Sequence, residues 1–139
     1  MFNKNYNINI YAGDYPEVIG GAFMGSSFCL NEGRIQVNAK QVLNLNALKV
    51  IEDYYKMGTG VAVFHELLEA VIGAIEYPGA NPPEQKHDKE GNIVTDSDAY
   101  NNSHNRAKKL DQRFIEPIIE FDENDNLFYL LPQENEKGY

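Results

Sequence analysis

The sequence lacks several features that mark particular classes of protein. There is one cysteine, Cys29, so an internal disulfide is excluded, and its apolar setting in "SSFCLN" predicts that it packs as a small hydrophobic residue. No apolar run approaches the length of a membrane span. The N-terminus, "MFNKNYNINIYAGDY", lacks the basic start and apolar stretch of a signal peptide. We therefore expect a protein that is cytoplasmic as given, or one that is delivered or secreted as part of a longer chain.

Positive charge is also scarce. Lysine and arginine number 12 against 21 aspartates and glutamates, which gives a net charge of −9. Duplex nucleic acids and anionic membranes attract basic surfaces, so this balance argues against both as partners. The 139 residues, 42% of them hydrophobic, suit one globular domain with a real core. We expect residues 1–139 to form a single domain.

The first third of the chain has the pattern of strands. Residues 5–11, "NYNINIY", alternate strictly, with Tyr6, Ile8 and Ile10 on one side, which predicts a half-buried strand. Residues 17–39 are typical of short strands broken by glycines, and they end in the alternating stretch "RIQVNA". A small N-terminal β-sheet is therefore expected.

The rest of the chain has mainly helical periodicity. A stripe that begins at Leu45 predicts a helix that Gly58 ends, and a central helix follows at about 60–76. The polar stretch 80–98 predicts a long exposed loop, and a third helix is expected from about 99 to 116. The tail "NLFYLLP" indicates a short late strand. Strands followed by helices predict an α+β fold, with the small sheet packed against about three helices.

Three polar residues stand out in the central helix. In "VAVFHELLEAVIG", residues 61–73, only His65, Glu66 and Glu69 are neither apolar nor glycine. A buried carboxylate is costly unless it is paired or bound to a metal. A solvated face would continue polar above and below, whereas Val61 and Ile72 flank this one. These three residues are therefore the first candidates for a functional site.

Their spacing is that of a metal motif. Residues four apart lie on one helix face, so His65 and Glu69 project together, and Glu66 lies about a quarter-turn away. The zinc motif H-E-x-x-H has this geometry, and a carboxylate in the fifth position is an acceptable ligand. The third ligand must come from elsewhere. His104, on the expected inward side of the next helix, is the candidate, and His87, in the charged stretch "EQKHDKEG", is its rival.

The resulting hypothesis is a zinc site with an open position. His65, Glu69 and His104 would hold Zn²⁺, and Glu66 would act as the general base for a metal-activated water that attacks a carbonyl. In the competing interpretation these residues form a buried salt-bridge cluster, in which Glu66 or Glu69 pairs with Arg106 or Lys108.

Three further residues have alternatives that the sequence leaves open. Tyr100 and Asn102 could donate hydrogen bonds to a reacting carbonyl oxygen, or could simply start a helix, with Asn102 as its cap. Asp111 could orient a liganding histidine, or could be a solvated aspartate.

The stretch "FHELLEAVIGAIEYPGANPP…YNNSHNRA" resembles the zinc metallopeptidase domains of bacterial polymorphic-toxin and Rhs-type proteins. In that family a "HE-x-x-EA" helix leads through "G…PG" to an "AHN-x-A" element. The matching residues are His65, Glu66, Glu69, Ala70, Pro78, Gly79, His104, Asn105 and Ala107, and Ser103 replaces the alanine of the last element. The resemblance covers about residues 34–110.

The resemblance implies a zincin-like architecture and a zinc-dependent peptidase that acts on a protein or peptide substrate, often as the toxin domain of a longer secreted protein. It also implies that "RIQVNA" is the strand beside which an extended substrate pairs. Two other functions fit the same residues: a metal-binding module without catalysis, and a protein-interaction domain without metal. Metal content separates the last from the others, and substitution of Glu66 separates the first two.

Overall fold

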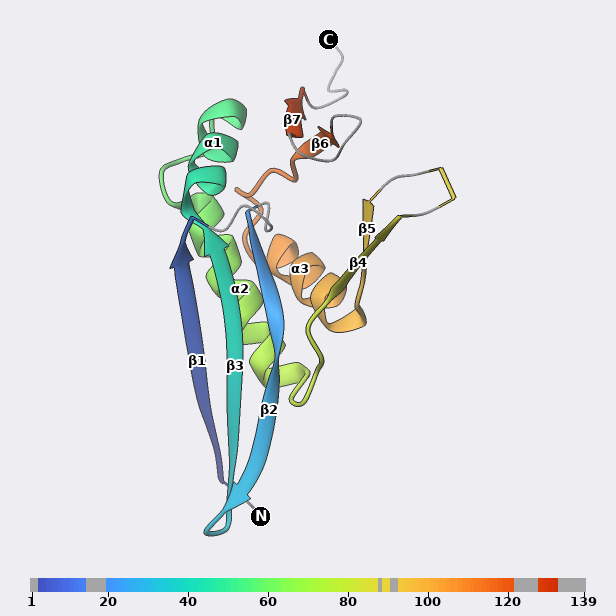
Figure 1. The fold of residues 1–139 in the computed structure, drawn as a ribbon. Coiled ribbons are helices and arrows are strands. Elements are labelled where there is room, and N and C mark those ends of the chain that lie inside the picture. Colours follow the sequence, from blue (N-terminus) through green and yellow to red (C-terminus); the bar gives the residue numbers. More distant parts are fainter. Residues whose placement is uncertain (1–2, 15–19, 88, 91–92, 122–127, 133–139) are drawn as a thin grey trace.

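A computed structural model describes residues 3–14, 20–87, 89–90, 93–121 and 128–132. It confirms the α+β class, with a mixed three-stranded sheet and three helices (Figure 1). The elements are β1 (Asn3–Gly13), β2 (Gly21–Asn31), β3 (Arg34–Asn44), α1 (Leu45–Tyr55), α2 (Val61–Glu76), β4 (Glu84–His87), β5 (Ile93–Asp96), α3 (Asp98–Leu110), β6 (Ile118–Phe121) and β7 (Phe128–Leu131). None of the helices in these ranges is long and apolar enough to cross a membrane.

The three long strands have the spatial order β1-β3-β2. β2 and β3 form an antiparallel hairpin, whose turn residues Glu32 and Gly33 both have positive φ, as a two-residue turn of this kind requires. β2 was expected as short pieces, but it runs on from Gly21 through Gly25 because a bulge between Phe23 and Ser26 absorbs the irregularity. Residues 17–19 of that expectation lie outside the described part.

The position of β3 corrects one expectation. β1 lies parallel to β3 along its whole length, from Asn3↔Arg34 to Gly13↔Asn44, and β2 pairs with the other side. Both backbone edges of β3 are therefore occupied, and "RIQVNA" cannot pair with an extended substrate.

Helix α2 lies across one face of the sheet, and α3 lies beside it (Figure 1). The face of β3 towards α2 carries buried Val37, Ala39, Gln41 and Leu43. A core cluster of Phe23, Ala39, Ala74 and Ala99 joins the two layers. A Cβ on Gly73 would lie 2.5 Å from the Phe23 ring, so α2 approaches β2 this closely only because Gly73 has no side chain.

Burial of the strands is uneven because the helices cover only part of the sheet. The β2–β3 hairpin extends beyond the helices in Figure 1, and Phe28 and Leu30 are 60% and 64% exposed there. Cys29 lies between them and is exposed, so the prediction that it packs as a small hydrophobic residue is wrong. In β1, Ile8 packs against the core, whereas its neighbours Tyr6 and Ile10 on the same side are exposed.

The second half of the chain differs from the expected pattern in two places. The predicted loop 80–98 contains the β4–β5 hairpin, in which the β-branched run from Ile93 to Thr95 favours a strand. α3 ends at Leu110 rather than near residue 116, because Asp111 takes an extended conformation at the helix end. The released chain forms β6, which pairs with β7 in the predicted late strand.

Candidate metal centre

Helix α2 begins at a defined point because α1 caps it. The residue at its N-cap, Gly60, offers no side chain, and the carboxylate of Glu52 in α1 accepts a hydrogen bond from the Ala62 N–H at 2.9 Å. This cap fixes where the helix starts and hence which residues point inward. His65, Glu66 and Glu69 are 0%, 4% and 0% exposed, so the predicted burial of these polar residues is confirmed.

Helix α3 brings His104 to the same place. Ser97 caps α3 by accepting a hydrogen bond from the Tyr100 N–H at 3.1 Å, so Asn102 is not the cap and is instead exposed within the helix. The α3 side chains buried near α2 are small (Ala99, Ser103 and Ala107), and they allow the two helices to approach closely.

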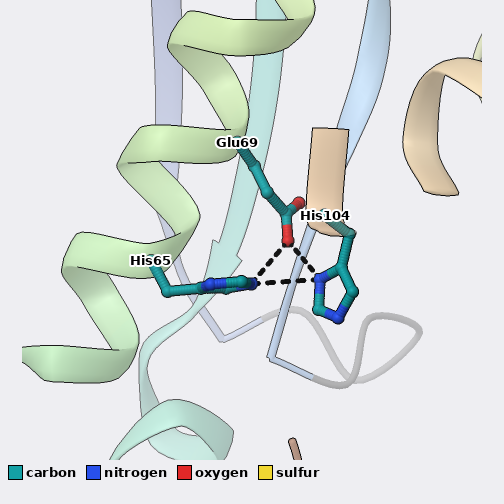
Figure 2. Close-up of side chains that lie close together, drawn as sticks. All are labelled: His65, Glu69 and His104. Carbon is teal, nitrogen blue, oxygen red and sulfur yellow. Dashed lines mark hydrogen bonds and ion pairs between the residues drawn. The ribbon is translucent and has the colours of Figure 1, made fainter. Parts of the chain in front are cut away.

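Three side-chain atoms that could bind a metal ion, two from α2 and one from α3, lie close together (Figure 2). His65 Nε2 lies 2.9 Å from Glu69 Oε2 and 3.0 Å from His104 Nδ1, and His104 Nδ1 lies 2.6 Å from Glu69 Oε2. These three residues form a group that could hold a metal ion. The structure thus brings together the three residues that the sequence selected. His87 is in β4, and its side chain lies outside the described part.

The donor set fits a divalent metal. Two imidazole nitrogens and one carboxylate oxygen are ligands that zinc and similar ions accept. Ligands of a tetrahedral zinc ion are separated by ~3.3 Å when the bonds are 2.0–2.1 Å long, so these atoms would move apart by a few tenths of an ångström. Glu69 Oε1 and His65 Nδ1 are also buried without a hydrogen-bond partner among the described residues. The unpaired Glu69 oxygen, buried beside the three candidate ligand atoms, is consistent with a role of this carboxylate in binding a cation.

In the metal-free state His104 carries a positive charge. Its Nδ1 faces Glu69, and its Nε2 lies 2.7 Å from Glu116 Oε1. Carboxylates only accept hydrogen bonds, so both ring nitrogens donate. Burial disfavours the cation, but the hydrogen bonds to Glu116 and Glu69 outweigh burial and raise the pKa of His104 to about 10. A proton thus occupies Nδ1, the atom that would bind the metal.

The pairing that the competing interpretation assigned to Arg106 or Lys108 is not found among the described residues. Arg106 pairs with Glu76, and Lys108 Nζ lies 3.0 Å from Glu116 Oε1. Within the described ranges, neither of them pairs with Glu66 or Glu69. Sequence analysis missed Glu116, because it lies beyond the end of α3 and reaches His104 only through a change in chain direction that no periodicity predicts.

The carboxylate of Glu66 contacts the sheet. Its Oε1 accepts a hydrogen bond from Gln41 Nε2 at 3.0 Å, and a Cβ on Gly21 would lie 2.1 Å from the same oxygen. Burial, followed by the charge of Glu69, raises the pKa of Glu66 well above its usual value. Gln41 was also missed, although the sequence carried a signal: it is the one polar residue in the inward series Val37, Ala39, Gln41 and Leu43.

A cleft of about 130 Å³ opens beside these residues. Glu66, Tyr100, His104 and Glu116 form its polar part, and the remaining lining residues are Gly20, Gly21, Leu48, Ile51, Phe114, Pro117 and Ile119. The rings of Tyr100 and His104 are parallel, with centroids 6.2 Å apart. Burial, with the charge of Glu69 next, raises the pKa of Tyr100, so its hydroxyl stays protonated and can donate a hydrogen bond.

Asp111 does not orient a liganding histidine through a hydrogen bond in this structure. Its carboxylate accepts two hydrogen bonds from the Arg113 side chain, at 2.8 and 2.6 Å. The ring of His65 is instead covered by Phe114, which stacks on it with centroids 3.7 Å apart and planes 7° from parallel. Phe114 therefore shields one face of His65 from solvent.

Comparison of the chain with family models, curated proteins and solved structures found no match. The resemblance to toxin metallopeptidase domains therefore stays a prediction, and the geometry of the site carries the functional argument.

Proposed function

We propose that this chain is a zinc-dependent peptidase, in which His65, Glu69 and His104 hold the ion and Glu66 is the general base. The observation that supports this most strongly is the convergence of three donor atoms within 3.0 Å, beside a cleft that Glu66 also lines. Zn²⁺ held by these residues would act as a Lewis acid, which would polarise a carbonyl and make a water easier to deprotonate at neutral pH.

In this proposal Glu66 transfers the proton, and Tyr100 stabilises the reacting carbonyl group. Oε1 of Glu66 already accepts a hydrogen bond from Gln41, so Oε2 is the atom that takes a proton from the attacking water. The water oxygen adds to the carbonyl carbon, the C–N bond breaks, and the same carboxyl group returns the proton to the leaving amine. The raised pKa of Glu66 makes it a stronger base than a solvated glutamate. The Tyr100 hydroxyl in the cleft donates a hydrogen bond to the carbonyl oxygen.

Substitution of Glu66 tests the role of the base. Glu66→Gln should retain bound zinc, measured by mass spectrometry for metals, while hydrolysis of labelled casein falls by at least ~10²-fold. Glu76→Gln, at the end of the same helix and outside the cleft, is the matched control and should cleave as fast as the parent chain. A Glu66→Gln protein that also cleaves at the parental rate would remove Glu66 from the mechanism.

The second candidate is a metal-binding module without catalysis. It is favoured by the origin of the donors on two packed helices, since an ion held there would join α2 to α3. Structural zinc sites normally have four protein ligands, whereas the group found among the described residues has three. Catalysis is therefore the preferred proposal. Full zinc content without any hydrolysis by the parent chain would reverse this preference.

A toxin role rests on the sequence resemblance alone. Under this proposal, production of the chain inside a bacterial or eukaryotic cell slows growth, and proteomic profiling reveals one or a few shortened proteins. The Glu66→Gln chain should be harmless. Growth inhibition that persists in that variant would point to binding or aggregation, and the absence of inhibition in every host would remove the toxin proposal.

A further inference from the structure

The cleft has an apolar end that the proposed chemistry does not use. Leu48 and Ile51 of α1 are 2% exposed and form part of the core, and Ile119 of β6 is half-buried. Phe114 and Pro117, from the chain between α3 and β6, complete this lining. Five apolar side chains from two separate stretches of the chain therefore meet next to Glu66 and His104.

A glycine contributes to the space above this apolar end. A Cβ on Gly20 would lie 3.4 Å from Leu48 Cδ2 and 3.8 Å from Ile51 Cδ1. A side chain at position 20 would therefore extend over these two residues, in the space that the cleft now offers. The cleft volume of about 130 Å³ is close to that of an engineered apolar cavity of about 150 Å³ that holds benzene. There is room for one branched aliphatic side chain.

The charges in the cleft disfavour an acidic occupant. The charged lining residues are Glu66, His104 and Glu116, and no lysine or arginine among the described residues lines the cleft. His104 is already hydrogen-bonded to Glu69 and Glu116. In the metal-free chain an entering carboxylate would therefore lose its hydration against apolar side chains, with no unpaired cation among the described lining residues to compensate.

From this lining we propose that the cleft binds one uncharged, branched aliphatic side chain of the substrate, of leucine or isoleucine size, and rejects an acidic one. This inference rests on the proposed function, because it names the substrate preference of the same site. A side chain seated against Leu48 and Ile51 leaves its own backbone beside Glu66 and His104, since all four residues line one cleft. The preferred substrates are thus peptides with an aliphatic residue next to the cleaved bond.

Binding of small amides tests this without any need for hydrolysis. The full chain, labelled with ¹⁵N and kept metal-free by a chelator, would be titrated with N-acetyl-leucinamide and, separately, with N-acetyl-aspartamide, which carries a negative side chain. We expect the leucine amide to bind at least ~10-fold more tightly, as burial of one aliphatic side chain implies, and to shift the amide signals of Leu48, Ile51 and Ile119. Equal binding of the two amides would overturn the proposal.

Variants provide a second check. Ile119→Glu places a charge in the cleft and should abolish binding of the leucine amide. Val50→Glu is the matched control, because Val50 is 51% exposed on α1 and lies outside the cleft. Unchanged binding by Ile119→Glu would refute the assigned pocket, and the comparison of the two amides on the parent chain does not depend on that variant folding. Selective binding without casein hydrolysis would retain the pocket and reject the peptidase, whereas hydrolysis without selectivity would do the reverse.

Discussion

The chain should bind a metal ion more tightly as the pH rises, because in the metal-free state a proton occupies Nδ1 of His104, one of the three atoms that would bind the ion. His104 donates one ring N–H to Glu116 and the other, from Nδ1, to Glu69. Nδ1 is the His104 atom that lies close to His65 Nε2 and Glu69 Oε2 (Figure 2). A metal ion can bind there only after this proton has left.

The magnitude follows from the pKa of His104, which is about 10. A pH of 7 lies three units below this pKa. Removal of the proton from His104 therefore costs about 4 kcal/mol, and the apparent free energy of zinc binding is weakened by the same amount. Below pH 10 each further unit of pH reduces this cost by about 1.4 kcal/mol. Between pH 6 and pH 8 the apparent affinity for zinc should therefore rise about 100-fold from this proton alone.

Competition with a chromophoric chelator at pH 6, 7 and 8 measures the affinity. Calorimetry in buffers of different ionisation enthalpy counts the protons released, and at least one is expected at pH 7. Glu116→Gln keeps an acceptor for Nε2–H but removes the charge, so it should lower the pKa of His104 and flatten the pH dependence. Glu120→Gln, exposed on β6, is its control. An affinity that changes less than about threefold over this range, with no proton release, would refute the assignment of His104 Nδ1 as a donor.

The same group gives a pH dependence of folding in the metal-free chain. The pKa of His104 is raised above its usual value near 6.5, so the folded state binds this proton more tightly than the unfolded state. The resulting stability is fully present below about pH 6.5 and is lost as the pH rises through about 10. Denaturant unfolding in the presence of a chelator should show this loss, and the His104→Gln protein should not.

Three further predictions concern single substitutions. His104→Ala should lose most of the bound zinc in metal analysis, whereas His87→Ala should retain it; the opposite result would make the histidine of β4 the third ligand. Gly21→Ala should displace the Glu66 carboxylate, because the new Cβ would lie 2.1 Å from its Oε1, and hydrolysis should fall while zinc content is unchanged. Glu52→Ala should lower the free energy of unfolding by about 1–2 kcal/mol, because α2 loses the acceptor at its N-terminus, and an unchanged denaturation midpoint would contradict this.

The ligand set could be predicted from the sequence because helical periodicity is local. The four-residue spacing of His65 and Glu69 fixes their common face once a helix forms, and the apolar residues around them indicate that the face is buried. His104 followed from the inward stripe of the next helix. These inferences require only that two amphipathic helices pack together, which the apolar pattern itself favours.

The remaining features depend on contacts between distant segments, and periodicity does not report them. The parallel pairing of β1 with β3 joins residues 31 positions apart and makes β3 a central strand. Glu116 reaches His104 only because α3 stops at Leu110 and the chain changes direction. The exposure of Cys29 depends on how far α2 extends over the sheet. Gln41 differs from these, because a single polar residue in an apolar alternation was visible and pointed to a buried partner.

The contact between Glu69 and His104 closes a loop of 35 residues. The end of α2, the β4–β5 hairpin and most of the first two turns of α3 lie within this loop. With its single cysteine the chain cannot form an internal disulfide, and an ion held by both helices would join the two ends of this loop only while the chain is folded. Such an ion would stabilise the fold by the free energy of its binding to the folded chain, and this stabilisation grows with the concentration of free metal. Doubling the length of a loop costs only ~0.6 kcal/mol, so the hairpin could lengthen considerably while both ends of the loop stay in place.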